Sequence, residues 1–204
     1  MVVHIANSAP AIAGALLIQE PCRVDLPDFA VETRDFAEIA DEFHARVARI
    51  VWCNVASVDE RGRPRSRIMH PIWDGATGWI GTWLTSVRAK HQAPSIKVTQ
   101  LRRNPYVSLA YVSEITRPVY IDAEVEVLDD PETKRQFSAL ARSFPAPYGY
   151  DPAEFFGPPD DPRFGVLRLT QSRIALVEFP APPGKVSVWR GKVARTPGEI
   201  VRPY

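Results

Sequence analysis

Two residues near the middle of the chain have the types and spacing expected of a phosphate site. Ser95 and Lys97 open a short predicted helix that Asn104-Pro105 ends, because the residue before a proline avoids the helical region. The free backbone N–H groups of a helix start, with a hydroxyl and an ammonium beside them, form a natural pocket for a phosphate. The same residues also fit a simple helix cap followed by a solvated lysine.

Basic residues outside this helix favour the phosphate site. Arg65 and Arg67 are two residues apart in a predicted strand, so their side chains share one face, and Arg88 lies in the loop before the helix. Cations from separate elements that meet in one pocket would hold a phosphate ester through charge-assisted hydrogen bonds. A planar cofactor on the sheet would also account for three tryptophans that could otherwise be core residues: Trp73, Trp83 and Trp189.

Several other chemistries lack their motifs. The sequence contains no Walker phosphate loop, no glycine-rich dinucleotide fingerprint, no paired-histidine zinc motif and no nucleophile elbow. Cys53 lies in an apolar strand, where we expect a small core residue rather than a nucleophile. The histidines are scattered without metal-ligand spacing, so no metal site is predicted: His4, His44, His70 and His91.

The composition is that of one globular domain with extensions. The 204 residues include 25 Lys and Arg against 24 Asp and Glu, and a net charge of +1 gives no electrostatic case for binding nucleic acid. The longest apolar stretch near the start, residues 9–18, is half the length of the ~20 residues that a membrane helix needs, and no Lys or Arg precedes it. Two cysteines suit a reducing compartment. We therefore expect a cytoplasmic protein that does not enter a membrane.

Short strands joined by tight turns dominate the predicted elements. Strands are expected at residues 50–58, 65–73, 79–84, 106–112, 119–128, 165–169, 174–179 and 186–189. Helices are expected at residues 33–49, at 95–103 and, after Asp130-Pro131, at 132–143. The 20 prolines argue for loops and strand edges and against a helical bundle. This pattern predicts a mainly β (α+β) fold, an antiparallel barrel with flanking helices.

The chain is expected to divide into three parts. Residues 1–32 form an N-terminal arm, residues 33–179 the domain, and residues 180–204 a tail that contributes to the site or to a dimer contact. Within the domain, residues 144–163 form a loop that carries six prolines and several aromatic residues.

The residues singled out above resemble those of a known family. The run Arg67-Ile68-Met69-His70-Pro71-Ile72-Trp73, the strand at 79–83, and the segment from Ser95 to Asn104-Pro105 are similar to the pyridoxamine 5′-phosphate oxidase-like flavin-binding split barrels. The resemblance covers roughly residues 36–130. It implies an antiparallel six-stranded split β-barrel and a homodimer with two FMN sites formed between the subunits.

The resemblance also assigns the site residues. The strand that carries Arg67, Ile68, Met69 and His70 would run along the flavin ring. The positions that would hold the phosphate and the ribityl chain, or lie beside them, are Thr82, Trp83, Ser95 and Lys97, with Arg88 a weaker candidate. Because the loop at 83–94 is longer than usual in the family, Ser86 and Lys90 could take the places of Ser95 and Lys97. Trp189 resembles a tryptophan that some members bring to the flavin from the partner subunit.

Departures from the family bear on the substrate. The Arg-Leu-His-Asp-Arg-type segment with which true pyridoxamine phosphate oxidases hold the substrate phosphate has no match, and Pro118 stands where they often have a glutamine. Trp189 and the aromatic residues at 148–156 predict an apolar, stacking pocket instead. We therefore expect an FMN-dependent oxidoreductase that acts on a small organic molecule other than pyridoxamine phosphate. The alternatives are a deazaflavin-dependent reductase on the same fold and a non-catalytic flavin-binding protein.

Overall fold

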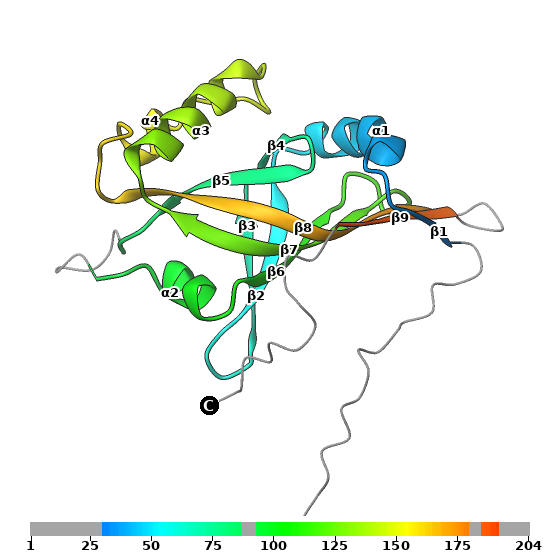
Figure 1. Cartoon of the computed structure of the whole chain (residues 1–204), viewed down its shortest axis with the longest axis horizontal. Helices are drawn as coiled ribbons and strands as arrows, with labels where there is room; N and C mark the ends of the chain where they lie inside the picture. Colours follow the sequence, from blue (N-terminus) through cyan, green and yellow to red (C-terminus); the bar gives the residue numbers. More distant parts are fainter. Residues whose placement is uncertain (1–29, 87–92, 180–184, 192–204) are drawn as a thin grey trace, which may run out of the picture.

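In the part of the chain that the structure describes, a single mixed β-sheet wraps into a barrel with helices on its outside (Figure 1). The computed structural model describes residues 30–86, 93–179 and 185–191. In these ranges the strands are β1 (Ala30–Thr33), β2 (Cys53–Val58), β3 (Pro64–Met69), β4 (Ile72–Asp74), β5 (Thr77–Trp83), β6 (Tyr106–Tyr111), β7 (Val119–Leu128), β8 (Phe164–Glu178) and β9 (Lys185–Arg190). The helices are α1 (Ala37–Ala48), α2 (Ile96–Arg103), α3 (Pro131–Ser143) and α4 (Ala153–Phe156).

The long strand β8 organises the sheet. One edge of β8 pairs with β7 along most of its length, while the other edge pairs first with β5 and then with β9. The strand order is β1-β9-β8-β7-β6-β2-β3, with β5 and β4 branching from β8. Among the described strands, β3 pairs only with β2. Residues 80–83 of β5 pair only with β8, whereas the start of β5 also pairs with β4. The barrel is therefore open between β3 and β5.

Alternating side chains fill the barrel. In β6, Val107, Leu109 and Tyr111 are buried while the residues between them are more exposed, as expected of a strand with one face on the core. The first helix contributes Phe43 and neighbours at helical spacing to the same core. Cys53 also belongs to it, and burial raises the pKa of its thiol to about 12, which confirms the expected core role.

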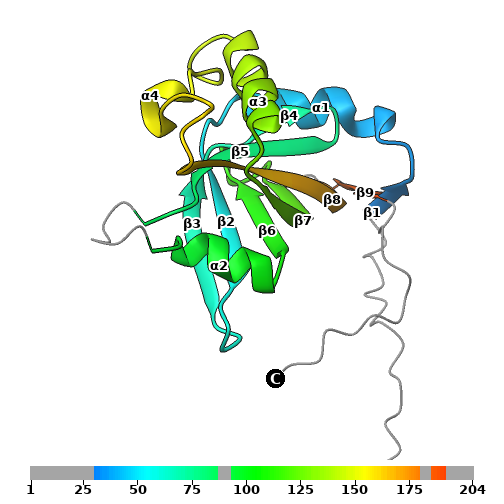
Figure 2. The ribbon, with the colours of Figure 1, turned by 60° about the vertical axis from the view of Figure 1, so that its left-hand side comes forward.

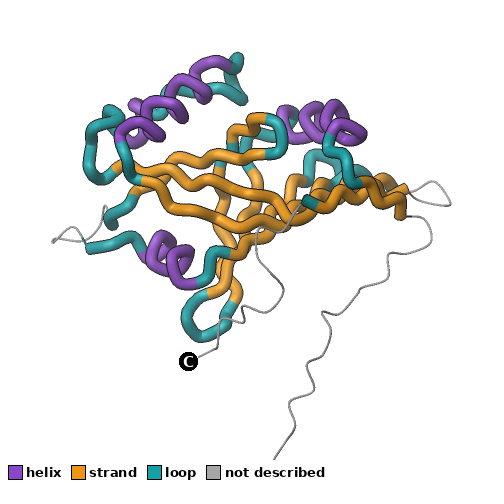
Figure 3. The backbone as a smooth tube through the Cα atoms, viewed as in Figure 1, coloured by secondary structure: helices purple, strands orange, loops and turns teal. Residues whose placement is uncertain are grey.

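The helices cover opposite sides of the barrel. Helices α3 and α4 pack over β8 and β5, whereas α2 packs against β7 and β2 on the other side (Figure 2). Helix α3 begins as the sequence predicts: Pro131 is its first residue, and the Asp130 carboxylate accepts a hydrogen bond of 2.8 Å from the Thr133 backbone N–H. The residues between α3 and β8 form the long connection that carries α4 (Figure 3).

The predicted fold class is confirmed, with differences in its parts. Within the described residues the sheet has nine strands rather than six, and the β1–β9 pair is parallel. Residues 30–32, expected in the arm, belong to β1, and the rest of the arm lies outside the described residues. The first helix starts at Ala37 rather than at Thr33.

Two strand boundaries also differ from the prediction, each for a local reason. The strand expected at 65–73 is two strands, β3 and β4, because Pro71 between them has no backbone N–H to donate to a ladder. The strands expected at 165–169 and 174–179 are one continuous strand, β8. The polar residues in the middle of β8 lie opposite the place in β7, between Asp122 and Ala123, where the register of the pairing shifts. No helix within the described ranges has the length and apolar character needed to cross a lipid bilayer.

Candidate functional site

A cavity of about 440 Å³ opens where the barrel is split. One side is the end of β3, from Arg67 to His70, and the other is β5 at Ile80, Gly81 and Trp83. Lys97 reaches it from the first turn of α2. The remaining wall comes from the connection between α3 and β8 and from the residues just before β2: Pro147, Tyr150, Phe155, Phe156, Val51 and Trp52.

Arg67 and Lys97 bring two positive charges to one end of this cavity. The Arg67 guanidinium donates to Ser57 Oγ at 2.9 Å and to Gln100 Oε1 at 2.6 Å, and both partners are neutral. Neither cation forms an ion pair with any carboxylate in the described part of the chain. Burial and the nearby charge of Arg67 lower the pKa of Lys97 to about 8. This end of the cavity therefore carries positive charge that no carboxylate of the described residues balances.

Arg65, which the sequence places on the same face of the strand, is used differently. Its guanidinium donates to Asp59 Oδ2 at 3.0 Å, together with Arg63. Burial would raise the pKa of Asp59, but hydrogen bonds from the backbone of Arg63 and Arg61 and from the arginine side chains hold it well below its usual range. Asp59 therefore neutralises Arg65 within the β2–β3 turn, and Arg65 does not line the cavity.

Thr82 and Ser95 lie near the cavity without lining it. The Thr82 side chain is 1% exposed, and its hydroxyl has no hydrogen-bond partner among the described residues. Ser95 is the N-cap residue of α2, but its side chain makes no capping hydrogen bond. Both hydroxyls are thus uncommitted, and their predicted role beside a phosphate stays a prediction.

Aromatic side chains form the other end of the cavity. The His70 ring lies 4.7 Å from the Tyr150 ring and 5.3 Å from the Trp52 ring, measured between centroids. Phe156 stacks on Phe164 at 5.3 Å. Gly81 allows this packing, because a Cβ at its position would lie 2.4 Å from Phe156 Cε2. Among these residues, the sequence analysis named His70 as a site residue and included Tyr150 and Phe156 in the aromatic stretch expected to form a stacking pocket, whereas it did not single out Trp52 or Gly81.

Burial shapes the chemistry of His70. Its side chain is 9% exposed, and Nε2 is buried without a hydrogen-bond partner in the described structure. Burial lowers the pKa of His70, and a hydrogen bond to the Tyr148 backbone opposes that shift only in part. The imidazole is therefore neutral at pH 7, with its proton on Nδ1 and a lone pair on Nε2.

The remaining predicted site residues lie elsewhere. Trp189 packs on Phe36, with 5.6 Å between ring centroids, and does not line the cavity of its own chain. Ser86 bonds through its backbone N–H to the Ala93 carbonyl at 2.7 Å and does not line the cavity either. Arg88 and Lys90 lie outside the described residues. Within the described ranges, no cluster of three or more His, Cys, Asp or Glu side chains could hold a metal ion.

Two residues that position Arg67 escaped the sequence analysis. Gln100 lies three residues after Lys97 in α2, so both point from one face of the helix toward β3. Ser57 lies on β2 beside the β3 strand. The helical spacing of Gln100 was a usable signal, whereas the place of Ser57 depends on the strand register.

Comparison with known proteins assigns the chain to a family. The family model for pyridoxamine 5′-phosphate oxidase matches residues 39–178, and the chain belongs to this family, which is of the flavin-binding oxidoreductase type. The resemblance stated from the sequence is thereby confirmed. No curated protein matches the chain.

Solved structures share the fold at low identity. A protein from Clostridium acetobutylicum related to general stress protein 26, of the pyridoxinephosphate oxidase family, is 19% identical, with a TM-score of 0.55 over 76% of this chain and 96% of that one. A pyridoxamine 5′-phosphate oxidase-related, FMN-binding protein from Nostoc punctiforme is 16% identical, with a TM-score of 0.52 over 76% and 89% of the two chains. At these identities the likeness is one of fold.

Proposed function

We propose that this protein is an FMN-binding oxidoreductase that passes a hydride or an electron pair between the flavin and a small organic substrate. The observation that carries the proposal is the half-buried pair Arg67 and Lys97, whose charges no carboxylate of the described residues neutralises. A phosphate dianion would neutralise both, and Gln100 and Ser57 already hold the guanidinium in place. The FMN-binding relative from Nostoc punctiforme has the same fold.

The rest of the cavity suits a flavin ring. The edge of β3 from Arg67 to His70 has backbone groups without a strand partner on the cavity side, and the aromatic wall at Tyr150 and Phe156 offers a stacking surface. The buried Thr82 hydroxyl, which has no partner, is a further polar group beside the cavity. A bound flavin would supply the redox chemistry. The residues of the chain would bind its phosphate, orient the ring and keep water out.

The substrate we propose is uncharged and planar. Away from Arg67 and Lys97, the side chains lining the cavity are apolar or aromatic apart from His70 and Tyr150. In the described part of the tail, Arg190 pairs with Glu32 at 3.2 Å, and neither it nor Lys185 lines the cavity. A second phosphate would thus lack the arginine donors that desolvation of a dianion requires. Pyridoxamine phosphate should therefore be a poor substrate, with turnover well below about 1 per second in an oxygen-coupled assay.

A second copy of the chain would complete the site. Ile68 and Trp52, at the rim of the cavity, are 65% and 57% exposed. An isologous two-fold contact would cover these side chains and the neighbouring strand edge. Trp189 of the partner subunit remains the predicted contribution from across that contact. Light scattering of the FMN-loaded protein should give twice the 22.8 kDa of one chain, and a monomer would contradict the shared site.

The absorbance spectrum of the purified protein tests the cofactor. Bound FMN gives two absorbance bands, one in the near-ultraviolet and one at longer wavelength in the visible. Adding FMN should fill any sites that are empty after purification. A cofactor that absorbs near the flavin range but lacks the second, longer-wavelength flavin band would instead identify a deazaflavin. Bound FMN that no nicotinamide donor reduces would leave flavin binding intact and contradict the oxidoreductase part of the proposal.

A further inference from the structure

Arg67 differs from the other arginines that the described structure buries in whole or in part. Four arginine side chains are buried or half-buried among the described residues: Arg46, Arg67, Arg117 and Arg173. Arg46 and Arg117 contact Glu42, and Arg173 lies 3.4 Å from Asp122. Of these four, Arg67 is the one without a carboxylate partner in the described part of the chain. A guanidinium partly withdrawn from water without a counter-charge destabilises the free protein, which favours an anion from outside.

The partners that Arg67 does have are neutral and well buried. Its Nη2 donates to Gln100 Oε1 at 2.6 Å and its Nη1 to Ser57 Oγ at 2.9 Å. Because a guanidinium only donates, the Gln100 amide must turn its oxygen toward Arg67. Gln100 is 7% exposed and Ser57 is 4% exposed, so both acceptors are held by packing. They fix the guanidinium and leave its charge uncompensated.

The held guanidinium keeps donors for a ligand. It has more N–H groups than Ser57 and Gln100 use, and its side chain lines the cavity. Lys97, three residues before Gln100 in α2, also lines the cavity, and the charge of Arg67 contributes to lowering its pKa. The two cations are therefore close enough to act on one phosphate group.

A carboxylate at position 100 would change this arrangement with little change of shape. Glutamine and glutamate have nearly the same size, so a glutamate there would reach the same guanidinium. It would form the kind of ion pair that Arg46 makes with Glu42 at 2.6 Å. A phosphate would then approach a cation that is already neutralised, against the charge of the new carboxylate.

We propose that Gln100 is a positioning residue for the cofactor phosphate: it holds Arg67 in place and leaves the charge of Arg67 to the ligand, so the anion site depends on a neutral residue at position 100. This inference rests on the proposed function, since it takes the ligand of the cavity to carry a phosphate.

Gln100→Glu tests the proposal on the full-length protein. The affinities for FMN and for riboflavin, which lacks the phosphate, are measured by flavin fluorescence titration. We expect the ratio of the two affinities to fall at least fivefold through weaker FMN binding, with the riboflavin affinity changed less than twofold. The free energy of unfolding of the cofactor-free variant should not fall, because the new carboxylate pairs with Arg67.

Gln100→Met separates the charge of the partner from its hydrogen bond. This substitution removes the acceptor without adding a charge, so the ratio should fall only about twofold. In the Arg67→Ala background the same substitution should leave the ratio unchanged, because Gln100 acts through Arg67. Thr99→Glu is the matched control: it places the same charge on an exposed position of α2 that does not line the cavity, and should change the ratio less than twofold.

Several results would overturn the proposal. One is a ratio in Gln100→Glu that equals the wild-type ratio, and another is an equal fall in Thr99→Glu. A fall in Gln100→Met that persists when Arg67 is absent would show that Gln100 does not act through the guanidinium. A Gln100→Glu variant that is less stable than the wild type, or that does not fold, would show that the expected ion pair does not form.

The wild type separates this inference from the proposed function. A wild type that prefers FMN at least tenfold, with the preference kept in Gln100→Glu, refutes the role of Gln100 and leaves FMN binding intact. Equal wild-type affinity for FMN and riboflavin overturns both. If the wild type binds neither flavin, the proposed function fails, and binding of inorganic phosphate to the wild type and to Gln100→Glu is compared by phosphorus NMR. Gln100→Glu should then lose phosphate binding, and phosphate that binds both proteins equally, or neither, overturns the inference.

Discussion

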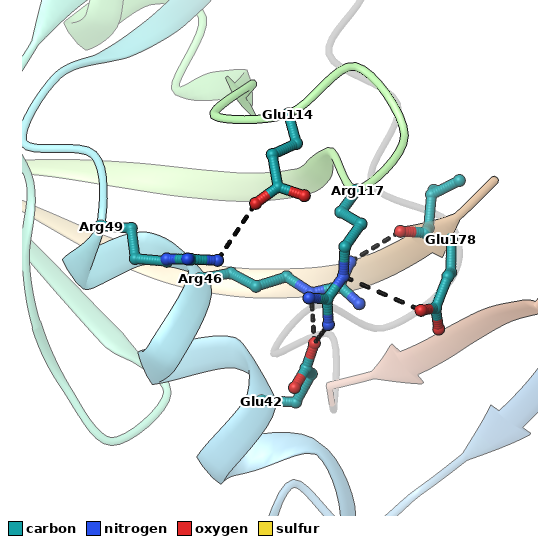
Figure 4. Close-up of polar contacts among 7 residues, drawn as sticks. Glu42, Arg46, Arg49, Glu114, Arg117 and Glu178 are labelled. Atoms are coloured by element: carbon teal, nitrogen blue, oxygen red, sulfur yellow. Dashed lines mark hydrogen bonds and ion pairs between the residues drawn. The ribbon is translucent and has the colours of Figure 1, made fainter.

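Arginine side chains are partly or fully buried in two regions of the described structure, and the two regions differ in what surrounds the charge. Between α1, the β6–β7 loop and the end of β8, Arg46 donates to Glu42 at 2.6 Å and to the Val177 carbonyl at 2.6 Å (Figure 4). Arg117 donates to the same Glu42 at 2.5 Å and lies 3.9 Å from Glu178. We call Glu42, Arg46, Arg117 and Glu178 the Glu42 cluster. At the split of the barrel, by contrast, Arg67 and Lys97 have only neutral partners.

This difference separates a structural contact from a binding site. In the Glu42 cluster, hydrogen bonding from Arg46 holds the pKa of Glu42 below its usual value, so the carboxylate is charged and the arginines are neutralised. In the cavity no carboxylate of the described residues plays this part, which is the reason for proposing a bound phosphate there. Both regions contain cations that are at least partly buried, so the number of arginines does not distinguish them. What distinguishes them is that a carboxylate contacts the cations in the Glu42 cluster and none of the described carboxylates contacts those in the cavity.

The largest effect that we expect is a loss of stability when the Glu42 cluster is disrupted. Arg46→Met removes the charge and leaves the Val177 carbonyl and part of Glu42 without a donor. We expect a loss of about 3 kcal/mol in the free energy of unfolding, the upper end of the range for leaving a buried acceptor unsatisfied, because the Val177 carbonyl loses its donor while the partly exposed Glu42 keeps Arg117. Denaturant unfolding measures the loss, and FMN affinity should stay as in the wild type. A variant that folds with unchanged stability would refute the structural role.

Substitutions in the cavity should have the opposite effect, lowering the affinity for FMN without lowering the stability of the protein. Lys97→Ala and Arg67→Ala should each weaken FMN binding by about 2 kcal/mol, the scale of a lost charge-assisted hydrogen bond. The cofactor-free protein should be no less stable, since each change removes a half-buried charge that lacks a carboxylate partner in the described chain. Flavin fluorescence titration and denaturant unfolding check the two parts. Unchanged FMN affinity in both variants would place the site elsewhere.

The lowered pKa of Lys97 predicts a pH dependence of binding. FMN needs the protonated amine, which the free protein loses as the pH rises above about 8, while the phosphate is already a dianion above pH about 6. Affinity should therefore be level between pH 7 and 8 and then fall, by at most about 1.4 kcal/mol per pH unit. The stability of the FMN-free protein should change in the opposite direction. Its free energy of unfolding should rise as the pH rises above about 8, because a lysine whose pKa is lowered on folding destabilises the fold only while it is protonated.

Lys97→Arg is the matched control for this pH profile. Its guanidinium stays charged throughout, so the fall above pH 8 should disappear. A profile that falls equally in the wild type and in Lys97→Arg would assign the titration to another group.

The smallest expected effect concerns the aromatic wall. Gly81→Ala places a methyl group 2.4 Å from Phe156 Cε2, so the phenyl ring must shift. We expect FMN binding to weaken by about 1 kcal/mol, the cost of a modest overpacking. Gly62→Ala, in a turn with no heavy atom within 4 Å of the added Cβ, tests a glycine away from the cavity and should leave FMN affinity unchanged. Equal effects of the two substitutions would show that the wall does not contact the cofactor.

Local signals in the sequence account for much of the fold. The strand at Val119–Leu128 was predicted with its observed ends, because apolar and polar residues alternate along it. Asp130-Pro131 marked the start of α3 for a reason the structure confirms, a side-chain cap. The continuous strand β8 was missed because its polar middle resembles a turn, and its pairing with β7 across an irregularity is a long-range property.

The candidate site was predictable only in part. Spacing placed Arg65 and Arg67 on one face, but the neutralisation of Arg65 depends on how the β2–β3 turn presents Asp59. His70 was named from a resemblance, while its unpaired nitrogen depends on the packing of Tyr150 and Tyr148 against it, from a loop about 80 residues away. The chemistry of the site lies in such long-range contacts.

The affinities of FMN and riboflavin, measured side by side on the wild type and on Lys97→Ala, test the central claim most directly. The two ligands differ only in the phosphate, so their ratio reports what the Arg67 and Lys97 charges contribute. We predict that the wild type binds FMN at least tenfold more tightly than riboflavin, which is about 1.4 kcal/mol. In Lys97→Ala that ratio should fall severalfold while the riboflavin affinity is kept. Equal affinity of the wild type for both ligands would contradict the account.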